Sequence, residues 1–141
     1  MRFQIVRSLT LFIILIASAC LPTRAASVNP ASPSAIAETS SLLQDLTVGD
    51  YAAFVSNGTA PFKKLTRQEF NDASSMVAPH LKKGFSIAYM GEVRKQNIPI
   101  TLWKIVPSQS GDDFLATLSM TNGHVAGFWI HQLSQEKIVG H

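Results

Sequence analysis

The stretch that decides the fold is residues 114–132, "FLATLSMTNGHVAGFWIHQ". Asn122-Gly123 lies in its middle, between two runs rich in β-branched, aromatic and other apolar residues. This dipeptide favours a type I′ turn, because both central residues of that turn need a positive φ. The stretch therefore predicts a β-hairpin whose strands cover residues 114–120 and 124–132.

The turn also predicts a register, since a two-residue loop fixes which residues lie opposite each other. Thr121 would then face His124, and the hairpin would have two mixed faces. One would carry Phe114, Ala116, Leu118, Met120, Val125, Trp129 and His131, and the other Leu115, Thr117, Phe128 and Ile130. Neither face is polar, so we expect helices to cover one face and a cavity or a partner subunit to meet the other.

A second pair of strands is expected just upstream. "FSIAYMGEVR" (85–94) and "IPITLWKIV" (98–106) have the same extended pattern, and "KQN" (95–97) would connect them tightly. Four strands in succession, each next to its sequence neighbour, predict an antiparallel meander.

Before Gly84 the spacing of apolar residues becomes helical. Ser34 is expected to cap a first helix that Gly49 ends, and Asp50 a short second one. Thr66 and Glu69 form a capping box for a third helix, which Pro79 should end or kink near Ala78. Helices followed by strands predict the α+β class, with N-terminal helices packed on a curved four-stranded antiparallel sheet.

The N-terminus is typical of an export signal. Arg2 and Arg7 precede the apolar run "LTLFIILIASACL", and "TRA" offers small residues for cleavage after Ala25. We expect a signal peptide over 1–25, a flexible linker over 26–33, one domain over 34–133 and a C-terminal tail over 134–141. The product would be periplasmic or extracellular, with no stable membrane span after cleavage.

Cys20 leaves a second way of processing open. "ASAC" (17–20) resembles a bacterial lipobox, although Ala17 stands where that pattern prefers a larger aliphatic residue. Cleavage before Cys20 would give a membrane-anchored lipoprotein lipidated on this residue. Cleavage after Ala25 would leave a chain without cysteine and therefore without disulfides or thiol chemistry.

The positive charge of the chain belongs to the leader. Three of its 12 Lys and Arg residues lie within residues 1–25, and none of its 9 Asp and Glu residues does, so the remaining chain is formally neutral. A basic surface for nucleic acid is therefore not expected.

Three segments resemble a known superfamily. "LLQDLTVGDYAAFV" (42–55), "FKKLTRQEF" (62–70) and "LATLSMTNGHVAGFWI" (115–130), in this order, look like NTF2-like (cystatin-like fold) domains. The closer resemblance is to an uncharacterised secreted bacterial NTF2-like domain family. It implies a cone that opens between helices and sheet, often dimeric through the sheet. It implies no catalytic residue, because the superfamily combines enzymes with proteins that have no chemistry.

Aromatic residues are the best candidates for a binding site. Tyr89, Trp103 and Trp129 lie on expected strands, and His131 would end the Trp129 face. Large rings on a sheet suit a small apolar ligand or a protein partner, although a small core also needs such rings.

Catalysis and metal binding have little support in the sequence. A base and a donor in an apolar cone could come from Asp45, Asp50, Tyr51, Tyr89 or His131, but Asp50 and Tyr89 have simpler structural uses. The four histidines lack ligand spacing, so no catalytic residue, metal or cofactor is assigned.

Three hypotheses follow. The leading one is an exported, non-catalytic NTF2-like domain that binds a small apolar ligand or a protein partner, with a homodimer through the sheet as one form. The alternatives are a small isomerase or hydrolase using a carboxylate or His base in the cone, and a self-associating structural protein of the envelope.

Overall fold

The computed structural model describes residues 30–109 and 111–133. The expected signal peptide, Cys20 and the tail over 134–141 lie outside these residues. The elements in chain order are α1 (Pro33–Val48), α2 (Tyr51–Ser56), the 3₁₀ turn η1 (Phe62–Lys64), α3 (Arg67–Leu81), β1 (Phe85–Lys95), β2 (Ile98–Pro107), β3 (Phe114–Thr121) and β4 (His124–Gln132).

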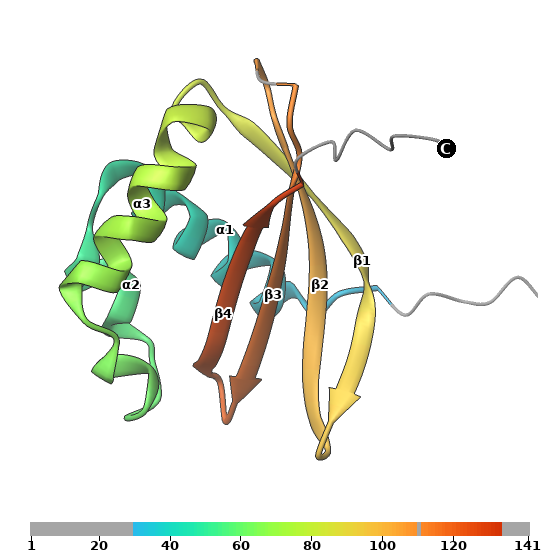
Figure 1. Cartoon of the computed structure of the whole chain (residues 1–141). Helices are drawn as coiled ribbons and strands as arrows, with labels where there is room; N and C mark the ends of the chain where they lie inside the picture. Colours follow the sequence, from blue (N-terminus) through green and yellow to red (C-terminus); the bar gives the residue numbers. More distant parts are fainter. Residues whose placement is uncertain (1–29, 110, 134–141) are drawn as a thin grey trace, which may run out of the picture.

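The predicted α+β class is confirmed. The four strands form one open antiparallel sheet in the order β1-β2-β3-β4, so each strand pairs with its sequence neighbour. In Figure 1 the three helices lie behind the sheet and beside β4, and the sheet face toward the viewer carries no described helix. We call the helix side the inner face and the opposite side the outer face.

The first helix begins earlier than predicted. Ser32, rather than Ser34, is its N-cap and accepts the N–H of Ala35 at 3.2 Å, with Pro33 at the first helical position. Proline suits that position because its missing N–H would have no helical partner there. Gly49 ends the helix as predicted, with φ of 78°.

The two other predicted N-caps are confirmed. Asp50 accepts the N–H of Ala53 at 3.0 Å, and Thr66 and Glu69 form a reciprocal capping box. The prediction that Pro79 ends or kinks α3 near Ala78 was wrong about the end, because the helix continues to Leu81. Only His80 and Leu81 follow Pro79 in the helix, so the missing N–H of the proline interrupts the helix close to its end.

Both hairpin turns have a left-handed backbone, as predicted for Asn122-Gly123. Asn122 and Gly123 have φ of 52° and 78°, and Gln96 and Asn97 have φ of 50° and 65°. These values are those of type I′ turns, whose twist matches that of the flanking strands.

The register predicted for β3 and β4 was correct only beside the turn. Thr121 pairs with His124 and Met120 with Val125, but then a bulge intervenes and Ser119 pairs with Gly127. The extra residue, Ala126, reverses the alternation of β4. Phe128 and Ile130 therefore pair with Leu118 and Ala116 on the inner face, while Trp129 and His131 pair with Thr117 and Leu115 on the outer face.

The core lies between the helices and the inner face. Leu42, Leu43 and Leu46 of α1, with Phe70 and Val77 of α3, are buried against the strands. The strand side of this cluster consists of Trp103, Ile105, Phe114, Ala116, Leu118 and Val125. β1 contributes less, because its inward residues Phe85, Ile87 and Tyr89 are only half-buried.

A short segment after α2 extends the sheet beside β4. Gly58 forms a parallel bridge with Val125. The N–H of Val125 donates to Asn57 O at 2.9 Å, and the N–H of Thr59 donates to Val125 O at 2.8 Å. The chain then turns away into η1, so this fifth strand is only begun.

Candidate functional site

The bulge places Trp129 on the outer face, beside apolar side chains of the other strands. Three neighbouring strands place Leu102, Thr117 and Trp129 in one row across it, and Ile100, Ser119 and Gly127 in the next. Several of its apolar side chains are largely exposed: Trp129 at 61%, Val93 at 52%, Ile98 at 42% and Val106 at 36%. Several exposed apolar side chains on one face make that face a candidate interaction surface.

Trp129 is held in place on this face by its neighbour along β4. A Cβ on Gly127 would lie 2.7 Å from Cζ3 and 3.1 Å from Cη2 of Trp129. The ring therefore lies against the glycine backbone and buries it, while most of the indole remains exposed. An aromatic ring fixed in this way loses little conformational entropy when a partner covers it.

The charges of the outer face are mostly compensated. Lys104, in the central part of the sheet, forms an ion pair of 2.8 Å with Asp113. His131 lies beside Leu115 at the end of β4 and is exposed. A partner covering the middle of this face would not have to bury a lone charge, which is what usually opposes such contacts.

The four predicted binding residues do not come together. Trp103 is 1% exposed and belongs to the core, where its Nε1–H donates to Thr101 Oγ1 at 2.9 Å. Tyr89 packs on it with ring centroids 5.3 Å apart. Trp129 and His131 lie on the opposite face. The prediction that they share a face with Phe114 was wrong, because the bulge at Ala126 reverses the alternation of side chains along β4.

Tyr89 instead lines an open groove beside the start of α1. This groove, about 750 Å³, lies between the start of α1 and the first hairpin. Glu92, Arg94 and Thr101 supply its polar groups, and Glu92 and Arg94 form an exposed ion pair of 3.4 Å. We call it the α1 groove.

The space enclosed between α2, α3 and β4 is small. It has a volume of about 80 Å³ and is lined mainly by apolar side chains, among them Phe54, Leu65, Phe70 and Phe128. Small-molecule pockets usually have volumes of about 300–1,000 Å³, so this cavity holds no drug-sized ligand without rearrangement.

The residues considered for catalysis have structural partners. Asp50 caps α2, and the hydroxyl of Tyr51 donates to Leu65 O at 2.7 Å beneath the Arg67 guanidinium, which lies 4.7 Å from the ring centroid. The pKa of Asp45 is raised, first by partial burial and then by the nearby carboxylates of Asp50 and Glu38. Asp50 thus stabilises the start of α2, and Tyr51 is held against the turn before α3.

Among residues 30–109 and 111–133, no group of three His, Cys, Asp or Glu side chains could hold a metal ion. No helix in the same ranges is long and apolar enough to cross a membrane.

Sequence reasoning missed the importance of Asn57. Its Nδ2 donates to Glu38 Oε2 at 3.0 Å and to Gly123 O at 3.2 Å, and its Oδ1 lies 3.0 Å from His124 Nδ1. This one side chain thus connects α1, the loop after α2 and the β3–β4 turn. The only signal was the loop-forming "SNGT", which does not indicate distant partners.

Comparisons with known proteins give no family. Neither a protein-family model nor a curated protein sequence matches this chain.

Proposed function

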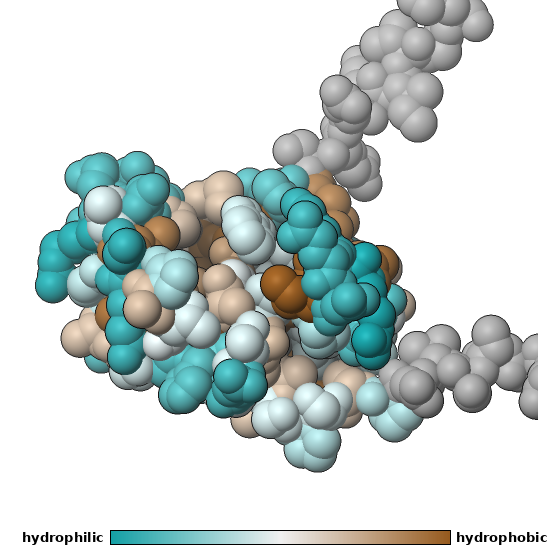
Figure 2. Space-filling view, turned by 90° about the horizontal axis from the view of Figure 1, so that it is seen from below, coloured by the Kyte–Doolittle hydropathy of each residue, from teal (hydrophilic) through white to brown (hydrophobic). Residues whose placement is uncertain are grey.

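We propose that this chain is an exported, non-catalytic domain of the NTF2-like type that binds a protein partner through its outer sheet face, and that this partner is a second copy of the chain. The observation that carries the proposal is the uncovered apolar face with Trp129 fixed on Gly127 in its edge strand β4. Hydrophobic residues reach the surface among hydrophilic ones when the molecule is seen from below (Figure 2).

The apolar area supports association between copies. Burying a large apolar side chain contributes about 1.5–3 kcal/mol when it was fully exposed before. The outer face offers several partly exposed apolar side chains. In a two-fold symmetric dimer each of them would be buried in both copies. The paired charge of Lys104 and Asp113 means that two such faces can meet without strong repulsion.

The carboxylate in the α1 groove supports the proposal that the domain is non-catalytic. This carboxylate, Glu92, is exposed and paired with Arg94, whereas a general base is usually tuned by burial or by a dedicated partner. The isomerase or hydrolase hypothesis would have to use this carboxylate with Tyr89 as the donor.

A small ligand is the second candidate function, and the same groove favours it. Its volume lies in the range of ligand sites, and Tyr89 presents an aromatic wall there. A ligand would bind beside α1, well away from the outer face.

The experiment that tests self-association is sedimentation of the exported, purified chain over a range of concentrations. Wild type should be dimeric, and Trp129→Lys and Leu102→Lys should be monomeric but folded. Met76→Lys is the matched control, because Met76 is 38% exposed but lies on α3, away from the sheet. A wild-type monomer at high concentration would refute the proposal.

Mass spectrometry of the same material tests export and the ligand. A chain starting at Ala26 supports cleavage by signal peptidase, whereas a lipidated chain starting at Cys20 identifies an anchored lipoprotein. A retained small molecule in the native spectrum that is lost in Tyr89→Ala would favour the second candidate function.

A further inference from the structure

The free edge of β4 is a second interaction surface, distinct from the outer face. β4 is the last strand of the sheet, and beyond Val125 no described strand pairs with its outer edge. Unpaired edges of this kind present main-chain donors and acceptors to any extended chain that lies beside them.

The direction of these groups follows from the bonds that the strand does make. The N–H of Leu133 donates to Asp113 O, on the β3 side, at 2.8 Å. Main-chain groups alternate along a strand, so those of Trp129 and His131 also point toward β3, and those of Phe128 and Ile130 point outward. Within residues 30–109 and 111–133, no partner is recorded for these outward groups.

The chain itself shows that this edge accepts a strand. Val125, the outward-pointing residue before the bulge, exchanges two hydrogen bonds with Asn57 and Thr59. The neighbouring segment then leaves the edge at Pro61. The positions beyond the bulge would continue the same pairing if a further extended segment were present.

A groove accompanies the unpaired part of the edge. It has a volume of about 350 Å³, and its walls combine side chains of η1 and the start of α3 with those of β4. Phe62 and Leu65 form the helical wall, and Phe128 and Trp129 belong to the strand. Alternate side chains of an added strand would meet apolar surface here on both sides.

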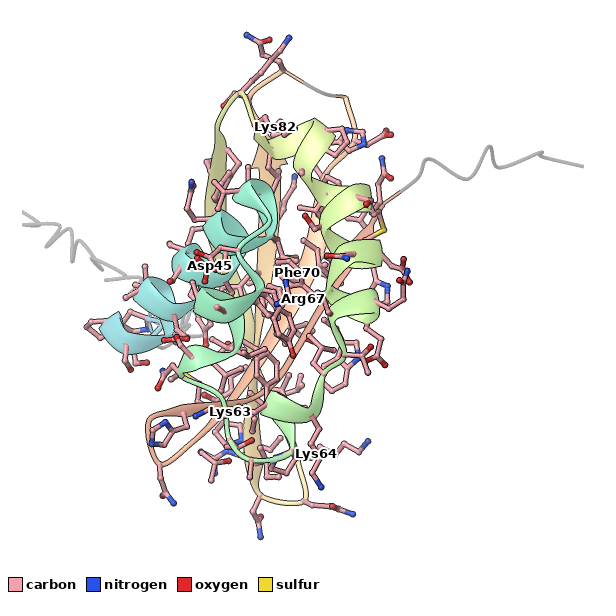
Figure 3. The ribbon with its side chains drawn as sticks, turned by 90° about the vertical axis from the view of Figure 1, so that its left-hand side faces the viewer. Asp45, Lys63, Lys64, Arg67, Phe70 and Lys82 are labelled. Atoms are coloured by element: carbon pink, nitrogen blue, oxygen red, sulfur yellow. The ribbon has the colours of Figure 1, made fainter. Side chains whose placement is uncertain are left out.

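Two lysines and one carboxylate lie at this groove. Lys64 lines it and Lys63 is its exposed neighbour, and Figure 3 shows both at the lower end of the molecule, below Arg67 and Phe70. No ion pair is recorded for either lysine within the described residues. The groove's carboxylate, Glu69, is held by the main-chain N–H and the hydroxyl of Thr66.

We propose that the free edge of β4 binds an extended peptide segment of a partner protein as an added strand. The peptide carries apolar residues that pack against Phe62, Leu65 and Phe128, and an Asp or Glu that pairs with Lys64. Main-chain bonds to Phe128 and Ile130 supply affinity, and the side chains supply selectivity, as in other cases of β-strand addition.

This site does not depend on the outer-face dimer. The peptide lies in the plane of the sheet, whereas the second copy covers its face. Leu102 lies in the outer face and lines no part of the groove. Leu102→Lys should therefore abolish dimerisation and leave peptide binding unchanged, so that failure of one proposal is distinguishable from failure of the other.

The test uses random dodecapeptides displayed on phage, selected on the exported chain. Selected peptides should alternate apolar residues and carry Asp or Glu, and the synthetic peptides should slow exchange of the Phe128 and Ile130 amides. Ile130→Pro removes one outward donor at a position where an edge strand tolerates proline, and should weaken binding about tenfold.

A charge exchange tests the proposal independently of that proline. Lys64→Glu should weaken binding of the acidic peptides about threefold, and replacing their acidic residue by Lys should restore it. Lys82→Glu, at the end of α3, is the control and should change nothing.

Four results would overturn the proposal. They are no enrichment of peptides, binding that survives both Ile130→Pro and Lys64→Glu, and binding that requires removal of residues 134–141, which would make the chain's own tail the occupant. The fourth is concentration-dependent protection of the Phe128 amide without peptide, which would make a second copy the occupant.

Discussion

The indole of Trp129 and the backbone of Gly127 form one packed unit on the outer face, and a side chain at position 127 cannot coexist with the observed ring position. Gly127→Ala should displace the ring and destabilise the fold by about 1–3 kcal/mol, as overpacking usually does. Denaturant unfolding and the emission maximum of the Trp129 indole measure the two effects.

Gly111→Ala is the matched control for that substitution. A Cβ at Gly111 meets no atom within 4 Å, and its backbone is outside the left-handed region. Stability should be unchanged. Equal effects of the two alanines would show that the ring is not held by Gly127.

Asn57 should be costly to replace. Asn57→Ala removes two donated bonds and the contact with His124 Nδ1, and we expect a loss of about 1–3 kcal/mol in the free energy of unfolding. Asn71→Ala, on the exposed side of α3, should have little effect. A small loss for Asn57→Ala would contradict its role in connecting α1 to the hairpin turn.

Replacing Thr39 by valine should increase the stability of the protein. The Thr39 hydroxyl is buried in α1 and has no hydrogen-bond partner among residues 30–109 and 111–133, and such a group costs about 1–3 kcal/mol. Thr39→Val keeps the shape and should stabilise the protein. Thr47→Val should not, because the Thr47 hydroxyl donates to Leu43 O at 2.7 Å. Thermal unfolding of both variants provides the comparison.

Neutralising Asp45 and neutralising Glu69 should change the stability of the protein at neutral pH in opposite directions. The pKa of Asp45 is raised by partial burial and by neighbouring carboxylates, so its charged form opposes folding. Asp45→Asn should therefore be more stable than wild type at pH 7. The gain should disappear as the pH falls through the raised pKa toward the ordinary value of 3.8.

The pKa of Glu69 is lowered, mainly by the main-chain N–H of Thr66 and then by its hydroxyl. Its charged form supports folding above the ordinary value of 4.5, and this support is lost as the pH falls through the lowered pKa. Glu69→Gln should thus be less stable than wild type at neutral pH and approach it in acid. Unfolding curves from pH 3 to 7 give both differences, and the same sign for both variants would contradict this account.

Much of the fold could be predicted because its signals are local. Asn122-Gly123 fixes a turn through the φ values of two residues, and Thr66 with Glu69 marks a helix start through contacts three residues apart. The bulge at Ala126 has only a weak local signal, because Gly127 inside a strand suggests a bulge but does not fix its position. Its position depends on how Val125, Phe128 and Ile130 are buried against helices far away in the sequence.

The candidate site was predicted less well for the same reason. One unrecognised bulge moved Trp129 and His131 to the other face of the sheet, and a one-residue slip always has that effect. Trp103 and Trp129 have similar strand contexts in the sequence, yet one is in the core and the other on the surface. Composition and alternation do not separate these two cases.

The order of elements along the chain affects how the protein can be made. A chain that emerges N-terminus first presents α1, α2 and α3 before any strand, although Leu42, Leu43 and Leu46 are buried with Phe114, Ala116 and Leu118 of β3. The apolar side chains of the helices therefore remain exposed until the last hairpin has emerged and can pack against them. Nascent chains in this state are prone to aggregate, and a holding chaperone would be needed most between the emergence of Leu81 and that of Val125.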